Sequence, residues 1–215
     1  MTQTLFITLE GIDGSGKSTQ SKNLAQWLEH FTGRKTICTF EPGGWKGGST
    51  FREFILGSKD YNPLSELLLF LADRSEHVEK VILPLLRTGN NIICERYNES
   101  TLAYQSGGHK LNIAHVRRII KACNFPEPEI KILLDISPEL ALERIKSRKN
   151  NIDKHDKFES EGLALMKRVS KCYRELADSQ PENFIVINCD KLSEHEVFNQ
   201  IISQLEARIK QCQSR

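Results

Sequence analysis

Residues 5–18 of this 215-residue chain read LFITLEGIDGSGKS. The apolar run at the start is typical of a buried strand, and residues 11–18 match the pattern G-x-x-x-x-G-K-[ST]. In such a turn the glycines let backbone N–H groups surround phosphate oxygens, and the dipole of the helix that follows favours their negative charge. The sequence therefore predicts a strand, a phosphate-binding loop (P-loop) and a helix over residues 17–30.

The P-loop predicts that the chain binds ATP together with Mg²⁺. Lys17 is expected to reach the β- and γ-phosphates, and Ser18 is expected to ligate the metal ion. Glu95, at the end of another predicted strand, is the second candidate ligand for Mg²⁺; a buried partner for a neighbouring Arg or Lys is an equally good interpretation of it. The residues predicted to bind ATP are Gly11, Ile12, Asp13, Gly14, Ser15, Gly16, Lys17, Ser18 and Thr19.

Five short apolar segments alternate with helical patterns along the chain. This alternation predicts a parallel sheet with right-handed crossovers and with ligands beyond the carboxyl ends of the strands. The expected fold is α/β, a five-stranded parallel sheet with helices on both faces, of the P-loop NTPase type. Helical patterns also cover residues 50–56 and a run from 62 to 87, in which Pro84 is expected to bend or end the helix. The predicted strands are 5–10, 35–40, 91–95, 130–136 and 184–188.

The composition is ordinary for a globular protein, with 39% hydrophobic and 27% charged residues. A formal charge of +2 provides no basic field for a nucleic acid, and no apolar run approaches the roughly 20 residues of a membrane-spanning helix. The chain starts without a signal-peptide pattern, so a cytoplasmic location is expected. We expect one domain over residues 1–215, with neither a nucleic acid nor a membrane as partner.

A P-loop alone does not specify a reaction. The order N-K-x-D, with which GTPases read guanine, is absent, since residues 188–191 read NCDK. The six cysteines are scattered without a C-x-x-C pair, so reduced thiols are expected rather than a zinc site. A small kinase fits these observations best.

Further motifs follow the P-loop in order. Residues 41–44 read EPGG, with Gly48 and Arg52 behind them. Residues 68–74 read LLFLADR, and residues 95–105 read ERYNESTLAYQ. Through these motifs the chain resembles the thymidylate kinase family over most of its length, and several spaced motifs in one order are far more specific than any one of them.

The resemblance implies an enzyme that transfers the γ-phosphoryl group of ATP to thymidylate (dTMP), giving dTDP. It also implies a homodimer, because members of the family pack long helices across a two-fold axis. The Leu-rich stretches 64–71 and 78–86 are the candidates for that interface. An ordinary core helix would have the same pattern.

The resemblance assigns nine residues to the acceptor. Arg52 and Arg96 are expected on the acceptor phosphate, because planar guanidinium groups pair bidentately with phosphate oxygens. Phe70 is expected to stack on the base, while Arg74, one helical turn later, donates to a pyrimidine carbonyl. Without the resemblance, Phe70 would be interpreted as a core residue. The predicted acceptor residues are Asp13, Arg52, Phe70, Arg74, Arg96, Ser100, Thr101, Tyr104 and Gln105.

The other members of this set are expected near the sugar and the base. By resemblance, Asp13 contacts the sugar, where a carboxylate can accept the proton of the 3′-hydroxyl group. Tyr104 is expected to lie against the sugar and to leave no room for a 2′-hydroxyl group. Ser100, Thr101 and Gln105 are expected to make polar contacts near the base.

Residues 143–159 read ERIKSRKNNIDKHDKFE, with six Lys or Arg and hardly an apolar side chain. Such a segment is either a solvated helix end and loop or a mobile lid that folds over phosphates. Some family members carry a basic residue in the P-loop, where this chain has Gly14, so the lid is expected to supply the catalytic cation. The candidates are Arg148 first, followed by Arg144, Lys154 and Lys157. The predicted catalytic residues are Lys17, Arg96 and Arg148.

Three residues depart from the family pattern. Phe40 stands where a basic residue is usual, Trp45 stands for Thr, and Glu95 stands for Asp. The first two, placed at the acceptor pocket, leave open a kinase for another or a modified nucleotide. A third interpretation is a nucleotide-binding protein with little turnover.

Overall fold

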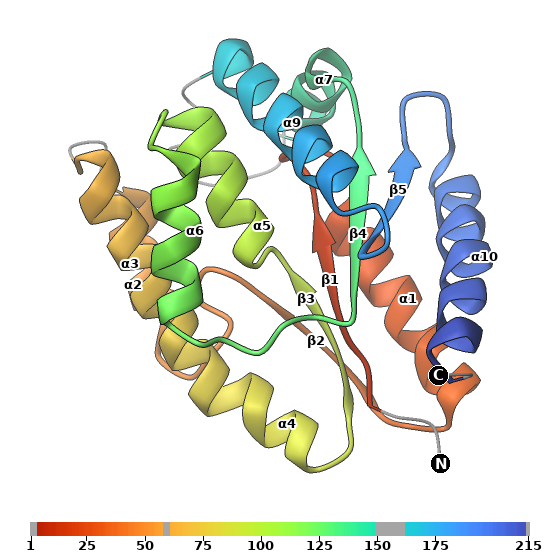
Figure 1. Ribbon diagram of the computed structural model, residues 1–215. Helices are drawn as coiled ribbons and strands as arrows, with labels where there is room; N and C mark the ends of the chain where they lie inside the picture. The colour runs from red at the N-terminus through yellow and green to blue at the C-terminus, as the bar shows by residue number, and fades with distance from the viewer. Residues whose placement is uncertain (1–3, 58–60, 149–161, 214–215) are drawn as a thin grey trace.

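The computed structural model describes residues 4–57, 61–148 and 162–213. They form one five-stranded sheet in the order β2-β3-β1-β4-β5, and every neighbouring pair is parallel (Figure 1). The α/β fold predicted from the sequence is therefore confirmed, and the strands begin and end within one residue of the predicted bounds. The strands are β1 (Phe6–Glu10), β2 (Thr36–Phe40), β3 (Asn91–Glu95), β4 (Ile130–Asp135) and β5 (Phe184–Asn188).

The strand order places β1, and with it the loop that follows β1, at the centre of the sheet. From β1 the chain crosses to β2 and β3 on one side, and it then crosses to β4 and β5 on the other. A parallel sheet has its ligand crevice where this direction reverses, beyond the carboxyl ends of the strands. The loops that follow β1, β3 and β4 therefore meet at one place.

Helices cover both faces of the sheet (Figure 1). On one face α1 (Lys17–Thr32) packs against β1, β2 and β3, beside α10 (Glu194–Gln213), which packs against β5. On the other face α9 (Gly162–Ser179) packs against β4. The other helices are α2 (Gly48–Gly57), α3 (Pro63–His77), α4 (Leu83–Arg87), α5 (Asn98–Thr101), α6 (Ile113–Ala122) and α7 (Pro138–Arg148), with π-helical turns η1 (Val78–Ile82) and η2 (Leu102–Gly108).

The predicted helical run from 62 to 87 is present as α3, η1 and α4. It begins at Asn62, whose side chain accepts a hydrogen bond from the N–H group of Ser65 at 2.9 Å. Near its end Pro84 removes one helical N–H group, and its ring would collide with a carbonyl in a regular α-helix. The wider turn of η1, with Leu83 N–H donating to the carbonyl of Val78, accommodates it.

Most apolar side chains join one large core on both faces of the sheet, and a smaller cluster lies beside β3. The five described cysteines are free thiols. Within the described part of the chain, no helix is long and apolar enough to cross a membrane. The smaller cluster consists of Phe6, Val78, Ile82, Ile92, Cys94 and Tyr97.

Candidate active site

The P-loop, residues 11–18, connects β1 to α1 as predicted and is pressed against two neighbouring elements. A Cβ atom on Gly11 would lie 2.7 Å from the carbonyl oxygen of Leu134 in β4. A Cβ atom on Gly14 would lie 2.5 Å from that of Ala141 in α7. Both glycines also have positive φ angles, +138° and +83°, which L side chains rarely adopt. Glycine at these positions therefore lets β4 and α7 close on the loop and fix its shape.

Lys17 is folded back over the P-loop. Its Nζ donates to the carbonyl oxygens of Gly11 at 3.0 Å and Ile12 at 2.9 Å, and the residue is buried. Burial, together with the charge of Arg96, lowers the pKa of Lys17 to about 7. Phosphate oxygens would supply a negatively charged hydrogen-bond partner for this ammonium group.

Ser18 and Glu95 meet beside the P-loop. The hydroxyl group of Ser18 donates to Oε2 of Glu95 at 2.7 Å, and that of Ser21, one turn later in α1, donates to Oε1 at 2.7 Å. A hydroxyl and a carboxylate are the hard oxygen ligands that Mg²⁺ prefers. Both hydrogen bonds of this carboxylate therefore come from hydroxyl groups, which fits the metal interpretation of Glu95 better than that of a partner for Arg or Lys.

A cavity of about 520 Å³ opens on the β3 side of the P-loop. All nine residues predicted for the acceptor line it, although they come from the P-loop, α2, α3, the loop after β3, α5 and η2. The remaining lining residues, Glu41, Pro42 and Leu56, were not predicted as site residues. The cavity is lined by Asp13, Glu41, Pro42, Arg52, Leu56, Phe70, Arg74, Arg96, Ser100, Thr101, Tyr104 and Gln105.

Arg96 and Asp13 form an ion pair at the end of the cavity next to the P-loop. Arg96 has a φ angle of +67°, and its guanidinium group lies 5.1 Å from the ring centre of Tyr104. The Tyr104 hydroxyl group in turn donates to Oδ2 of Asp13 at 3.3 Å. Burial alone would raise the pKa of Asp13, but the charges of Arg96 and Lys17 outweigh it and hold this pKa below its usual value. Arg96 and Asp13 are thus both charged, and each can bind a charged or polar group of a ligand.

Arg74 and Phe70 project from successive turns of α3 into the cavity. Arg74 is 2% exposed, and its Nε donates to Oε2 of Glu41 at 2.7 Å. Its NH1 group donates to the Thr101 hydroxyl oxygen at 2.9 Å and to the Asn98 side chain at 3.1 Å. Phe70 is half-buried and packs against the core while it lines the cavity, so both interpretations of this residue hold in part.

Ser100 and Gln105 are tied to groups behind the cavity wall. The Ser100 hydroxyl group lies 2.6 Å from Oε2 of Glu10 and 2.7 Å from the hydroxyl group of Tyr173. Gln105 donates to Glu66 at 3.4 Å, and its buried Oε1 has no hydrogen-bond partner among the described residues. The amide oxygen of Gln105 is therefore better placed than the Ser100 hydroxyl group to bind a ligand.

A second cavity, of about 540 Å³, lies on the other flank of the P-loop. Its walls come from the P-loop, from α1, from α7 and from the start of α10. Two substrates held in the two cavities would meet at the P-loop. The lining residues are Ser15, Gly16, Thr19, Gln20, Arg144, Leu192, Glu194 and Val197.

Comparison with known proteins connects this geometry to one family. The family model described as thymidylate kinase matches residues 9–201. The chain belongs to the thymidylate kinase family. A thymidylate kinase of Synechococcus sp. is 39% identical over 206 residues, which cover 95% of this chain and 96% of the relative. One of Maridesulfovibrio salexigens is 37% identical over 212 residues, covering 96% and 97%.

A solved structure agrees with this assignment to the thymidylate kinase family. The crystal structure of thymidylate kinase from Ehrlichia chaffeensis superposes with a TM-score of 0.76 at 29% sequence identity. The match covers 95% of this chain and 99% of that one. The resemblance inferred from the spaced motifs is therefore confirmed.

Two residues that depart from the family's motifs were placed at the acceptor pocket, and neither lines the cavity. Trp45 donates from its ring nitrogen to Asp73 at 2.8 Å, and Lys80 lies 4.3 Å from the centre of its ring. Phe40 is 45% exposed and lies 5.8 Å from the guanidinium group of Arg52. The expectation that these two residues shape the acceptor pocket is wrong, because Trp45 is directed towards Asp73 and Lys80, and Phe40, the last residue of β2, is exposed.

The lid predicted over residues 143–159 lies only partly within the described residues. Arg144 lines the second cavity together with P-loop residues. Arg148 is the last residue of α7, and its side chain, like Lys154 and Lys157, falls outside what the structure describes. The Cβ atom of any basic residue at Gly14 would collide with α7, so a cation for this site has to come from elsewhere.

Sequence reasoning missed several buried groups that complete the site. Glu10, which ends β1 directly before the P-loop, is fully buried, and burial together with the charge of Glu99 raises its pKa to about 7. Its only signal was an acid at the end of an apolar strand. Glu41 was recognised in its motif, yet the pattern did not indicate that it pairs with Arg74.

The pKa of Lys17 predicts proton uptake when ATP binds. Above pH 7 the buried side chain is largely neutral, and the phosphates raise its pKa towards 10.5, the ordinary value for lysine. Affinity for ATP should therefore fall as pH rises above about 7. At about pH 8.5 the terminal phosphate, with a pKa of about 6, is already ionised, so a proton taken up there is assigned to Lys17.

Isothermal titration calorimetry in two buffers of different ionisation enthalpy measures this uptake. The control is Lys17→Arg, whose guanidinium group stays protonated and should take up no proton, whatever its affinity. Equal binding enthalpies in both buffers for the wild-type protein would contradict the prediction.

Proposed function

We propose that this protein transfers the γ-phosphoryl group of ATP to dTMP and gives dTDP, as one domain spanning residues 1–215. The observation that carries the proposal is the P-loop between two cavities, one of which is lined by every residue predicted to hold the acceptor. Membership of the thymidylate kinase family supports both the reaction and the acceptor. Nothing in the cavity favours another acceptor, since Phe40 and Trp45 lie outside its wall.

The P-loop binds the triphosphate of ATP. The backbone N–H groups of residues 11–18 and of Thr19, in the first turn of α1, surround the phosphate oxygens. Lys17 leaves the carbonyl oxygens of Gly11 and Ile12 and binds the β- and γ-phosphates. Phosphate then replaces the weak dipoles that hold the ammonium group in the ligand-free protein.

Ser18 and Glu95 are the residues that would hold Mg²⁺. Their oxygens lie 2.7 Å apart, so both can reach one ion, directly or through water. When bound, Mg²⁺ neutralises charge on the phosphate oxygens. The longer arm of Glu95, compared with the Asp usual in the family, is oriented by its second hydrogen bond, which comes from Ser21.

The acceptor phosphate is bound by Arg96 and Arg52. Arg96 exchanges its ion pair with Asp13 for the phosphate, which frees the carboxylate to accept a hydrogen bond from the 3′-hydroxyl group of the sugar. Arg52, held by the Pro42 carbonyl oxygen at 2.9 Å, approaches from α2. Holding the two phosphates in line supplies most of the catalysis, because phosphoryl transfer needs little covalent help from the protein.

The base lies between Phe70 and the polar wall of η2. Arg74 donates to a carbonyl of the pyrimidine, and the unpaired Oε1 of Gln105 accepts from its N–H group. Thr101 orients Arg74, and Tyr104 lies against the sugar where a 2′-hydroxyl group would collide. These contacts select a deoxyribonucleotide with a pyrimidine base.

The developing negative charge in the transition state is stabilised by cations of α7 and the lid. Arg144 already lines the cavity on the ATP side of the P-loop, and Arg148 follows it by one helical turn. An arginine used in this way contributes on the order of 10³ to 10⁵ in rate in related phosphoryl transfers. Arg148 remains our first candidate for this role.

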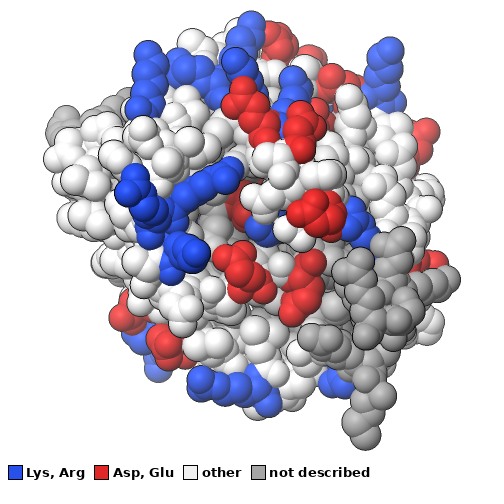
Figure 2. All heavy atoms as spheres, in the orientation of Figure 1, with Lys and Arg blue, Asp and Glu red and all other residues white. Residues whose placement is uncertain are grey.

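The protein forms a homodimer through α2 and α3. Leu64 and Leu68 of α3 are each 51% exposed, and Phe54 of the adjacent α2 is 55% exposed. Figure 2 shows a mostly uncharged surface at the left edge, where Figure 1 places these helices. The stretch 78–86 is a poorer candidate, because Val78 and Ile82 are buried within the chain.

The proposed reaction predicts the products of an assay across a panel of nucleoside monophosphates. With ATP and Mg²⁺, the purified protein should convert dTMP to dTDP in preference to the other monophosphates. Use of dUMP should be about 10- to 200-fold less efficient, because one methyl group in an apolar pocket is worth about 1 to 3 kcal/mol. Efficient use of another monophosphate with no turnover of dTMP would refute the proposal.

Arg96 is predicted to be essential for turnover. Arg96→Ala should lower kcat/KM for dTMP by about 10³- to 10⁵-fold, since it removes a bidentate partner of the reacting phosphate. The matched control is Arg117→Ala, an exposed arginine of α6, which should leave the rate unchanged. A loss below tenfold in Arg96→Ala, in protein with a wild-type circular dichroism spectrum, would remove Arg96 from the phosphate site.

The dimer is tested by mass in solution. Light scattering after size exclusion should give twice the 24.6 kDa of the chain, and Leu68→Asp should give the monomer mass. Val186→Asp, which places the same charge on an exposed apolar position of β5, is the control and should remain dimeric. A monomeric wild-type protein at micromolar concentration would contradict the proposal.

A further inference from the structure

One face of α3 holds the turn that follows β2. Asp73 accepts hydrogen bonds from the N–H group of Gly43 at 3.0 and 3.1 Å, Arg74 pairs with Glu41, and His77 contacts the same Glu41. The mechanism described above uses Arg74 and leaves His77 without a role. His77 is nevertheless fully buried at 0% exposure.

Both ring nitrogens of His77 have partners. Nδ1 lies 2.9 Å from Oε1 of Glu41, and Nε2 lies 2.6 Å from the Thr39 hydroxyl oxygen. A carboxylate only accepts hydrogen bonds, so the proton between His77 and Glu41 resides on Nδ1. The Thr39 hydroxyl group can donate or accept, and it therefore serves the ring in either protonation state. The imidazole is fixed in one orientation.

The backbone at Gly44 lies directly against the contact between Thr39 and His77. A Cβ atom on Gly44 would lie 2.2 Å from the Phe40 carbonyl oxygen, 2.6 Å from the Thr39 hydroxyl oxygen and 3.1 Å from Nε2 of His77. Only a residue without a side chain lets Thr39 and His77 approach each other here. The last glycine of the EPGG motif thus makes room for the histidine.

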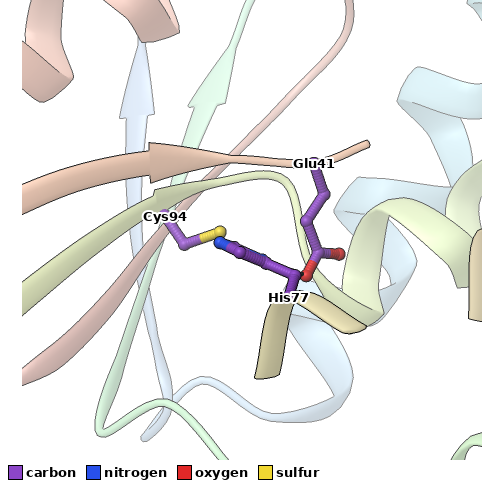
Figure 3. Close-up of side chains that lie close together, drawn as sticks. All are labelled: Glu41, His77 and Cys94. Carbon is purple, nitrogen blue, oxygen red and sulfur yellow. Dashed lines mark hydrogen bonds and ion pairs between the residues drawn. The ribbon is translucent and has the colours of Figure 1, made fainter. Parts of the chain in front are cut away.

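A metal site is the alternative interpretation of this cluster. Candidate ligand atoms of Glu41, His77 and Cys94 all lie within 4.8 Å of one another. Figure 3 shows the Cys94 thiol beside the end of the ring that is far from Glu41, so the two side chains face different nitrogens of His77. The thiol also donates to the carbonyl oxygen of Arg96 at 3.2 Å, and burial raises its pKa well above the usual value. The cluster therefore fits a neutral thiol and a hydrogen-bond network better than a bound ion.

The network leads from His77 to the acceptor cavity. Glu41 uses one carboxylate oxygen for His77 and the other for Nε of Arg74, and both Glu41 and Arg74 line the cavity. A carboxylate held through one oxygen alone can still rotate, whereas one held through both cannot. The guanidinium group that faces the base is therefore fixed by a residue that does not line the cavity.

We propose that His77 is a positioning residue for recognition of the acceptor base, acting through Glu41 on Arg74. The inference rests on the proposed function, in which Arg74 binds the base of dTMP. His77 touches no substrate. Its loss should therefore weaken binding of the acceptor and leave binding of ATP unchanged.

Two substitutions of similar polarity separate the two nitrogens. The amide nitrogen of His77→Asn takes the place of Nδ1 and keeps the bond to Glu41, whereas that of His77→Gln takes the place of Nε2 and keeps only the contact with Thr39. His77→Gln should raise KM for dTMP about tenfold, the loss expected for one charge-assisted hydrogen bond, with KM for ATP unchanged. His77→Asn should stay near wild type, and His30→Leu, an exposed histidine of α1, is the control.

A double-mutant cycle tests the route through Glu41. In a Glu41→Gln background, His77→Gln should change KM for dTMP by less than about twofold, because the connection is already broken. Equal KM values for dTMP in His77→Asn and His77→Gln, or equal rises in KM for both substrates, would overturn the inference and leave a packing role. Turnover by the wild-type protein in the same assay reports on the proposed function separately, and whichever monophosphate it accepts serves as substrate for the variants.

Discussion

The site depends on the close approach of three backbones around the P-loop. Gly11 lies against the carbonyl of Leu134, and Gly14 lies against that of Ala141, with no space for a Cβ atom at either contact. The loop is therefore fixed between β4 and α7 before it binds anything, and its N–H groups need little reordering to receive phosphate. Preorganised dipoles of this kind add electrostatic stabilisation to the in-line positioning on which phosphoryl transfer depends.

Around this fixed loop lie ionisable side chains that are paired with other groups of the protein. Lys17 donates to backbone carbonyl oxygens, Arg96 pairs with Asp13, and Glu95 accepts from two serine hydroxyl groups. In the proposed function, each of these groups exchanges its present partner for a phosphate, a sugar hydroxyl group or a metal ion. The pKa of Lys17 is depressed because burial and the charge of Arg96 lower it by more than the charges of Asp13, Glu95 and Glu10 raise it.

The wall of the cavity on the β3 side has a different construction, in which polar side chains are oriented by hydrogen bonds to neighbouring residues. Arg74 is oriented by Glu41, Asn98 and Thr101, and Glu41 is oriented in turn by His77. Ser100 is held by Glu10 and Tyr173. Side chains fixed through their neighbours lose little entropy when a ligand binds, which favours selective binding.

The sequence alone determined the succession of strands and helices along the chain and the P-loop, because periodicity and short motifs are local. The residues expected around the acceptor followed from the resemblance to the thymidylate kinase family, and the fold brings them to one cavity. The π-helical turn before Pro84 and the contacts of Trp45 and Phe40 were decided by packing across elements far apart in sequence. The same holds for the network from His77 through Glu41 to Arg74, which joins the turn after β2 to α3 between residues more than 30 positions apart in sequence. Such contacts depend on which side chains the sheet and its helices bring together, and the spacing of residues along the chain does not encode which distant side chains meet.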